Sequence, residues 1–527
     1  MIGLSIFLSV ALSFSLILNY LKLSSQKTAF EIVNDMGIGY NLGNSFDCYY
    51  SLKKVEKPDD QITLNGNPIP TKDLIIRIKK YGFKTIRFPI TWINFIDEKG
   101  NINSEWLNRV KEVVTWIINA NMYCIINVYS DGEYYNWLYL GIESRDIYIN
   151  LWSQIANEFK DYDEHLIFES MNFPQYFNIY FEYDYKTLLN LSQAFVDTIR
   201  NSENMNKQRL LIISGANADL ELSCNKNFKL PEDPMNKIAI SFHYFNPYNF
   251  VLENYFEPWN LTDYYSGYVT MFMPDLIWGT DNDYKELFTD INIIKSYFLD
   301  KNLPVIITEA GVLTEEKKDI RSIREYLYVL FSISVEYKGM MICLWDTSKN
   351  IEYTNSYTSY TMNYYNRKED KWLDEKIKNN FLFISKGRYI KLSEYYIYTN
   401  KEILISANNL DNYRLKFGDR TPLKIILNAK LKGKLFQDIS FKFRCYDNTT
   451  RYMDIDFGKK NLKREYDGTS TFTIDISEKG CISFIEVNKE FGKNENIIFN
   501  NLTVIFNNTF LSFDYKSYKT DLEKFIN

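Results

Sequence analysis

Histidine is nearly absent from this sequence: only two of its 527 residues, His165 and His243, are histidines. A metal site built from several imidazoles is therefore excluded. The six cysteines never occur as a CxxC pair, which argues against a zinc site as well. Positive charge is not in excess, because 61 Lys and Arg face 67 Asp and Glu, for a net charge of −6. That balance argues against a protein that grips nucleic acid by its phosphates, and we expect no cofactor.

Long apolar runs are also scarce, and the one exception spans residues 2–18. Only Ser and one Gly interrupt it, and Lys22 is the first cation after it. The run is long for the core of a signal peptide and short for a membrane-spanning helix. We expect residues 1–25 to be a secretory signal peptide and the mature protein to be secreted. The alternative is an uncleaved N-terminal membrane anchor, with the rest of the chain still outside the cytoplasm.

Four of the six cysteines carry a structural expectation. Cys124 and Cys343 lie inside apolar, strand-like runs and are predicted to be buried thiols. Cys445 and Cys481 are candidates for a disulfide in an oxidising compartment.

What the chain does have is apolar and aromatic mass. Hydrophobic residues make up 46% of it and aromatic residues 17%, with 42 tyrosines. That is enough to bury large cores, and the length predicts two or three domains. Aromatic side chains suit flat ligands such as sugar rings, although a compositional bias explains their number equally well.

Residues 26–383 alternate between short β-rich runs and longer amphipathic ones, which predicts an α/β fold of the (β/α)8 TIM-barrel type. An open doubly wound sheet is the alternative, but no glycine-rich phosphate turn follows an early strand. The expected strands are 37–42, 85–89, 123–128, 166–171, 209–214, 238–243, 304–309 and 340–345. The expected helices are 71–80, 104–121 (with Ser104 as its capping residue), 145–159, 184–200, 284–300 and 318–336.

The pattern changes after this region. Residues 386–527 contain short, often alternating apolar runs separated by Asn, Asp and Gly, which predicts a C-terminal all-β sandwich docked on the barrel. A short helix is expected at 518–525.

Polar and aromatic residues finish nearly every expected barrel strand. The motifs, in chain order, are GYNLGN (39–44), TIRFP (85–89), INVYSDG (126–132), FESMNFP (168–174), FHYFNPY (242–248), TEAG (308–311) and LWD (344–346). Barrel enzymes work at the carboxyl ends of their strands. This set of side chains is typical of a carbohydrate site.

These motifs, together with NYYNRKEDKW (363–372), resemble the cellulase-type enzymes of glycoside hydrolase family 5 over about residues 30–375. The resemblance implies retaining hydrolysis by two carboxylates, one a nucleophile and the other an acid/base. It places Glu309 at the nucleophile position and Arg87 beside it. It also implies that Asn172 holds the sugar 2-hydroxyl, that His243 is the strand-six histidine, and that Trp345 is the aromatic platform under the sugar.

Three departures from the family pattern surround the same point. Phe173 stands where the family has its acid/base glutamate, Tyr129 where it has a histidine, and Phe245 where it has a tyrosine. A phenylalanine has no proton to give, and general acid help contributes roughly 10²–10⁴ in rate. Among nearby carboxylates, Glu169 is expected to lie too deep in the barrel, whereas Asp131 and Glu133 are better placed.

Three interpretations stay open. The first is a secreted, catalytically impaired barrel that binds a β-linked glucan or a related plant or cell-wall oligosaccharide. The second is an active retaining hydrolase with Glu309 as nucleophile and a relocated acid/base. The third is a barrel scaffold whose C-terminal domain binds a protein or a surface.

Overall fold

The computed structural model describes residues 27–48, 55–129, 141–174, 182–252, 277–314, 318–348 and 362–391. It also describes the backbone of the strands between residues 396 and 513, and residues 521–523 and 525–526. The expected signal peptide, the loop that holds Asp131 and Glu133, and Cys481 lie outside these ranges. In the described part of the chain, no helix is both long and apolar enough to cross a membrane.

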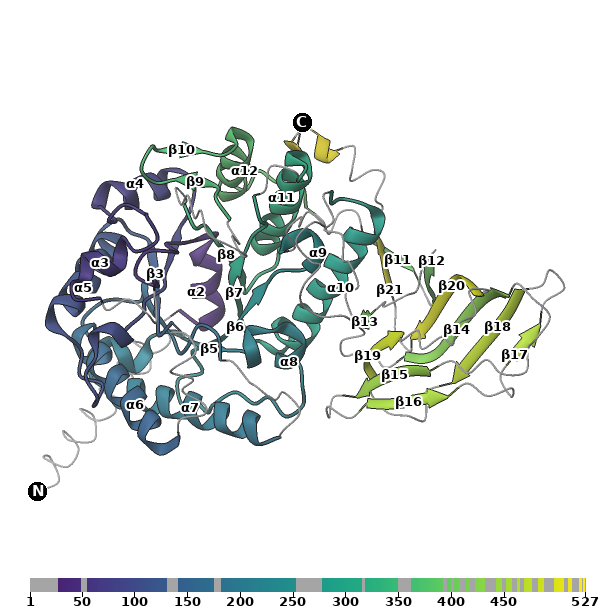
Figure 1. Ribbon diagram of the computed structural model, residues 1–527, viewed down its shortest axis with the longest axis horizontal. Coiled ribbons are helices and arrows are strands. Elements are labelled where there is room, and N and C mark those ends of the chain that lie inside the picture. The colour runs from purple at the N-terminus through teal and green to yellow at the C-terminus, as the bar shows by residue number, and fades with distance from the viewer. Residues whose placement is uncertain are drawn as a thin grey trace, which may run out of the picture.

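Eight parallel strands close into a barrel (Figure 1). Closure comes from β1, which pairs with β2 through Tyr40 and Ile86 and with β8 through Tyr40 and Leu344. The predicted TIM barrel is thereby confirmed, and each strand overlaps an expected run. The strands are β1 Gly39–Asn41, β2 Thr85–Phe88, β3 Tyr123–Asn127, β4 Leu166–Glu169, β5 Leu211–Ser214, β6 Ile238–Tyr244, β7 Val305–Ala310 and β8 Met340–Leu344.

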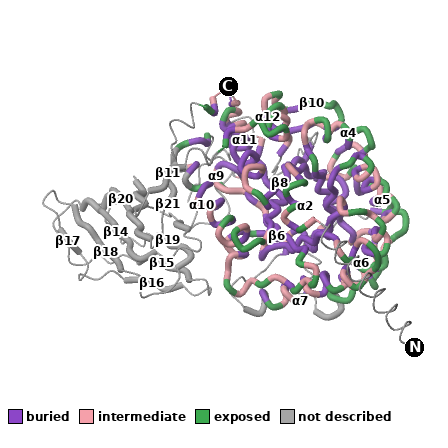
Figure 2. The backbone as a smooth tube through the Cα atoms, turned by 180° about the vertical axis from the view of Figure 1, so that it is seen from behind, coloured by how far each residue is buried: buried purple, intermediate pink, exposed green. Residues whose placement is uncertain are grey.

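Helices surround this barrel, and their apolar sides cover its outer face (Figure 2). On α5, for example, Trp106, Val110, Val113 and Ile117 are buried at helical spacing. The helices are α2 Ala29–Met36, α3 Pro58–Ile62, α4 Lys72–Lys80, α5 Ser104–Asn119, α6 Gly141–Glu158, α7 Glu182–Arg200, α8 Leu220–Ser223, α9 Tyr248–Val251, α10 Asp281–Tyr297, α11 Ile320–Glu336 and α12 Glu375–Ser385.

The predicted cap of α5 is wrong by one residue. Asn103 is the N-cap, and its side-chain oxygen accepts hydrogen bonds from the backbone N–H groups of Glu105 and Trp106. Ser104 is the first residue of the helix instead. Asn and Ser cap helices about equally well, so with both in sequence only the backbone geometry decides between them.

Helix α2 closes the amino end of the barrel. Its buried residues Ile32, Val33 and Met36 share one core with inward-facing strand residues such as Ile125 and Ile306. Cys124 and Cys343 are buried thiols, as predicted. Neither has any exposed surface, and neither forms a disulfide. The amino end of the barrel is therefore a packed apolar core.

The strands after residue 396 form antiparallel sheets. Five of them, in the order β12-β20-β14-β18-β17, make one sheet, and four, in the order β13-β19-β15-β16, make another, while β11 pairs with β21. Their packing as a sandwich stays a prediction. The strands are β11 Tyr396–Thr399, β12 Glu402–Ser406, β13 Arg414–Lys416, β14 Pro422–Leu431, β15 Lys442–Asp447, β16 Tyr452–Asp456, β17 Leu462–Arg464, β18 Thr469–Asp475, β19 Ile482–Val487, β20 Ile497–Phe506 and β21 Phe510–Phe513.

The end of the chain lies on the barrel, although the boundary predicted from sequence assigned it to the C-terminal domain. Leu522 and Ile526 are buried. The Phe525 ring stacks on Tyr328 of α11 with centroids 4.5 Å apart, and the Asn380 amide of α12 donates to the Phe525 carbonyl. The chain thus leaves the barrel after α12 and returns to it after β21, because these apolar side chains find their burial against α11 and α12.

Arg209 ties the amino end of β5 to the segment that joins α6 to β4. Its five N–H donors bind the Asn206 side chain and four backbone carbonyls, those of Phe159, Tyr162, Asp163 and Leu166. The side chain is almost fully buried. Burial lowers the pKa of its guanidinium to about 9. Four backbone carbonyl oxygens hold this guanidinium, and the nearby charge of Asp163 opposes the lowering of its pKa.

We expect Arg209→Ala to lower the free energy of unfolding by roughly 2–4 kcal/mol, because it leaves several buried carbonyls without donors. The measurement is urea unfolding followed by circular dichroism. Lys207→Ala, at an exposed position in the same connection, is the matched control and should change stability by less than about 0.5 kcal/mol. Equal effects of the two substitutions would show that the carbonyl cluster contributes nothing.

Candidate active site

The inward-facing strand positions change from apolar to polar toward the carboxyl end of the barrel. Side chains alternate faces along a strand, so residues two apart point the same way. Ile125, Ile167 and Ile306 belong to the apolar core near α2. The buried inward residues two positions later are Asn127, Glu169 and Thr308, joined at the same level by Asn41, Arg87, Ser214 and Ser241. A polar layer therefore covers the apolar core at the end where barrel enzymes carry their chemistry.

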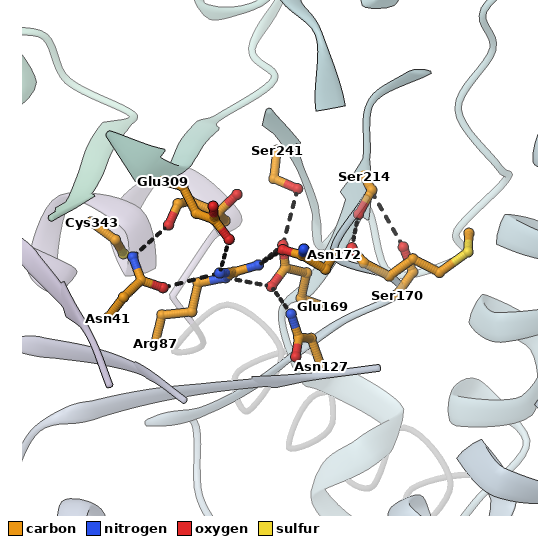
Figure 3. Close-up of polar contacts among 12 residues, drawn as sticks. Asn41, Arg87, Asn127, Glu169, Ser170, Asn172, Ser214, Ser241, Glu309 and Cys343 are labelled. Carbon is orange, nitrogen blue, oxygen red and sulfur yellow. Dashed lines mark hydrogen bonds and ion pairs between the residues drawn. The ribbon is translucent and has the colours of Figure 1, made fainter. Parts of the chain in front are cut away.

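Arg87 of β2 is the hub of this layer (Figure 3). Its five N–H donors are all used: two bind Glu169 (2.7 and 3.2 Å), one binds Glu309 (3.0 Å), and two bind the side-chain oxygens of Asn41 (3.0 Å) and Asn172 (2.5 Å). The guanidinium is fully buried. Burial by itself would lower the pKa of Arg87. The charges of Glu169 and Glu309 raise it by more than burial lowers it, so the pKa lies above its usual value.

The predicted hydrogen bond between Arg87 and Glu309 is present, but Arg87 makes more hydrogen bonds to Glu169, which was not predicted as part of the site. Glu169 receives two of the five hydrogen bonds and also binds the Asn127 amide at 3.1 Å. Glu169 is fully buried with no exposed surface. A carboxylate inside an apolar strand must be paired, and this signal in the sequence pointed to Glu169 as part of the network.

Glu309, at the carboxyl end of β7, is the carboxylate of the pair that reaches solvent. Its exposed fraction is 6%, against 0% for Glu169. Burial raises the pKa of Glu309 to about 7; Arg87 acts in the opposite direction, and the nearby charge of Glu169 adds to the increase. Burial, helped by the nearby charge of Glu169, therefore outweighs Arg87 in setting the pKa of Glu309.

His243 lies beside Glu309 and between two phenylalanine rings. Its Nδ1 is 3.6 Å from a Glu309 oxygen. Its ring centroid is 6.1 Å from that of Phe173, in a stacked arrangement, and 6.1 Å from that of Phe245, edge to face. The buried Nε2 has no hydrogen-bond partner among the described residues. Burial lowers the pKa of His243 well below its usual value, and the Arg87 charge lowers it further, so the imidazole is neutral at physiological pH.

The end of β4 carries Asn172 and Phe173 on a braced segment. The Asn172 N–H donates to the Val128 carbonyl at 3.0 Å, which joins the ends of β3 and β4 next to Tyr129. The Ser170 hydroxyl accepts a hydrogen bond from the Ser214 backbone N–H, and the Ser214 hydroxyl binds the Met171 carbonyl. With Asn172 Oδ1 held by Arg87, its amide nitrogen is the group left to donate to a ligand.

The structure thus brings most of the predicted site residues together. Six of them form one cluster in which each side chain contacts at least one other: Arg87, Asn172, Phe173, His243, Phe245 and Glu309. Trp345 is half-buried, and its backbone N–H donates to the carbonyl of Ala310, the residue after Glu309. Tyr129 is half-buried at the end of β3, where its N–H binds the Ile90 carbonyl.

The arrangement is half of a two-carboxylate site. Glu309 supplies a carboxylate that reaches solvent, and His243, which lies beside it, stacks on the phenyl ring of Phe173. In the described part of the chain, no group of three or more His, Cys, Asp or Glu residues could hold a metal ion. The chemistry available here is that of a carboxylate beside an aromatic surface.

Comparison with known proteins places this site in a family context. Residues 48–351 match the model of the cellulases of glycosyl hydrolase family 5. Endoglucanase A of Clostridium longisporum is 30% identical over 364 residues, which cover 68% of this chain and 66% of that protein. Cellulase/esterase CelE of Acetivibrio thermocellus is 30% identical over 355 residues, which cover 66% of this chain and 39% of that protein. The chain therefore spans less than two thirds of the length of these two relatives.

Solved structures give the same picture. A GH5-4 broad-specificity endoglucanase from an uncultured bovine rumen ciliate is 52% identical, covers 69% of this chain and 99% of its own, and superposes with a TM-score of 0.64. A family 5 lichenase from Caldicellulosiruptor sp. F32 is 28% identical, and the match covers 68% of this chain and 96% of that chain with a TM-score of 0.58. A mutant of the same lichenase in complex with cellotetraose is 27% identical, with the same coverage and TM-score.

We expect Glu309→Gln to remove a pH dependence of stability. The folded protein holds the Glu309 proton more tightly than the unfolded chain does, with a pKa of about 7 against the usual 4.5. The stability that this proton adds is complete below pH 4.5 and is lost as the pH rises through 7. The unfolding free energy of the wild type, relative to the variant, should fall by up to about 3 kcal/mol over that range. Urea unfolding between pH 4 and 8 measures it.

The control for this series is Glu98→Gln, an exposed position on the connection after β2. The difference in unfolding free energy between this variant and the wild type should stay constant across the same pH range. If the difference in unfolding free energy between the wild type and Glu309→Gln also stayed constant with pH, the raised pKa of Glu309 would be contradicted.

Proposed function

Because the chain belongs to glycosyl hydrolase family 5, we propose that it is a cellulase-like protein that binds β-linked glucan chains and does not cleave them at an enzyme-like rate. The observation that carries this proposal is the stacking of Phe173 on His243, beside Glu309. Retaining hydrolysis needs a proton donor for the leaving oxygen as well as a nucleophile. Here a hydrocarbon ring occupies the donor's place in the family motif.

The remaining side chains favour ligand binding. Trp345 offers an aromatic face, the Asn172 amide nitrogen offers a donor, and Nε2 of the neutral His243 offers a hydrogen-bonding atom for a sugar hydroxyl. The relatives named as endoglucanases and lichenase, and the cellotetraose complex, support a β-glucan as the ligand class. The apolar run at residues 2–18 supports secretion, which we include in the proposal.

An active hydrolase with a relocated acid/base is the second candidate, and the retained pair of Glu309 and Arg87 favours it. It needs a second carboxylate that reaches the glycosidic oxygen. Glu169 does not meet this requirement, because both of its oxygens are held by Arg87 and it is fully buried. Asp131 and Glu133 lie outside the described residues, and activity measurements distinguish this candidate from the first.

We expect Trp345→Ala to weaken cellotetraose binding at least tenfold, because a sugar ring loses its stacking surface. Isothermal titration calorimetry measures the dissociation constant. Trp116→Ala on the outer helix α5, where Trp116 is also half-buried, is the matched control and should leave binding unchanged. Absence of wild-type binding to cellotetraose and to soluble β-glucans would contradict the proposed function.

We expect the wild type to turn over an activated aryl β-glycoside slowly and an unactivated β-glucan not at all, because only a good leaving group departs without acid help. Phe173→Glu should raise hydrolysis of the β-glucan only partly. It restores a proton donor, but Tyr129 and Phe245 still differ from the family pattern, and residues that act as a unit do not contribute additively.

Reducing-sugar release and single-turnover kinetics measure these rates, with Phe173→Gln as the control that adds a polar side chain without a titratable proton. Rapid wild-type cleavage of the unactivated β-glucan, abolished by Glu309→Gln, would establish the second candidate in place of the first.

A further inference from the structure

The indole of Trp345 rests on the backbone of Gly43, in the loop after β1. A methyl group added to Gly43 would lie 3.1 Å from Cη2 and 3.2 Å from Cζ2 of the indole. These distances are too short for a relaxed contact. The position of Gly43 therefore limits how far the Trp345 ring can move toward the β1 loop.

Arg367 holds both sides of this contact. One of its terminal nitrogens, Nη1, donates to the Gly43 carbonyl at 2.7 Å, and the other, Nη2, donates to the carbonyl of Asp346 at 2.6 Å. Asp346 directly follows Trp345 in the chain. The same guanidinium therefore fixes the backbone that supports the indole and the backbone that carries it.

Arg367 is itself fixed by a buried network. Its Nε donates to the Tyr40 hydroxyl at 3.0 Å, and that hydroxyl donates to the Asp346 carboxylate at 2.5 Å. Arg367, Tyr40 and Asp346 are all buried. Burial by itself would lower the pKa of Arg367. Tyr40 and Asp346 raise it by more than burial lowers it, so the pKa lies above its usual value. Arg367 thus stays charged and held from three directions.

We propose that Arg367 is a positioning residue, which acts through Gly43 and Asp346 to set the height and tilt of the Trp345 ring as the platform for a sugar. This inference rests on the proposed function, because it takes Trp345 as a sugar-binding residue. A planar guanidinium can bind two carbonyls at once in a fixed geometry, whereas a lysine ammonium is a single point charge. The choice of arginine, rather than the presence of a cation, is what matters here.

The experiment uses the full chain labelled with 5-fluorotryptophan and followed by ¹⁹F NMR, with the Trp345 signal assigned from Trp345→Phe. We expect Arg367→Lys to shift the Trp345 signal in the free protein and to weaken cellotetraose binding about tenfold. The matched control is Arg209→Lys, since Arg209 is also a buried arginine with five bound N–H groups but lies at the opposite end of the barrel. It should lower stability and change neither readout.

Gly43→Ala provides a second test that leaves Arg367 intact, in case Arg367→Lys does not fold. Its methyl group should displace the indole and shift the same signal. An unchanged Trp345 signal and unchanged affinity in either folded variant, or equal shifts in Arg209→Lys, would overturn the inference. Failure of the wild type to bind cellotetraose would refute the proposed function instead, and the Trp345 signal of the free proteins would still decide whether Arg367 positions the ring.

Discussion

The buried guanidinium of Arg87 is the interaction on which the carboxyl end of the barrel depends. The guanidinium is fully buried, and its five N–H groups bind side chains from β1, β7 and the end of β4. A buried charge is stable only when its hydrogen bonds are satisfied. Removing any of Asn41, Glu169, Asn172 or Glu309 would leave a donor unpaired in a dry interior, so the positions of these four side chains are mutually constrained.

The charge balance around Arg87 separates the two glutamates. Glu169 holds two of the five hydrogen bonds and no exposed surface, so it serves as the fixed counter-charge. Glu309 holds one and reaches the solvent, and its pKa rises to about 7. An enzyme would use such a carboxylate together with a second proton donor. Beside Phe173 and Phe245, the buried Nε2 of His243 has no hydrogen-bond partner within the described part of the chain.

Much of the fold was predictable because its signals are local. The eight strands and six helices follow from the alternation of apolar runs, and each predicted strand overlaps an observed one. The resemblance of the motifs to glycosyl hydrolase family 5 also implied that Arg87 lies beside Glu309, and the two are hydrogen-bonded. The cap of α5 was assigned one residue too late, because Asn103 and Ser104 are both good caps. The final residues were assigned to the C-terminal domain, because short apolar segments do not reveal which surface they cover.

The sequence by itself determined the composition of the site: the carboxylate of Glu309, the aromatic Trp345, and a phenylalanine at position 173 that has no proton to give. Only the tertiary structure decided how charge and geometry are shared among them. It joined Glu169 to Arg87 by two hydrogen bonds. It also placed Arg367, between the short strands β9 (Tyr365–Asn366) and β10 (Lys371–Trp372), against the backbone of Gly43 and of Asp346, the residue after Trp345. The physical reason is that strengths of charge interactions and positions of rings depend on burial and on contacts between segments hundreds of residues apart, which no local pattern records.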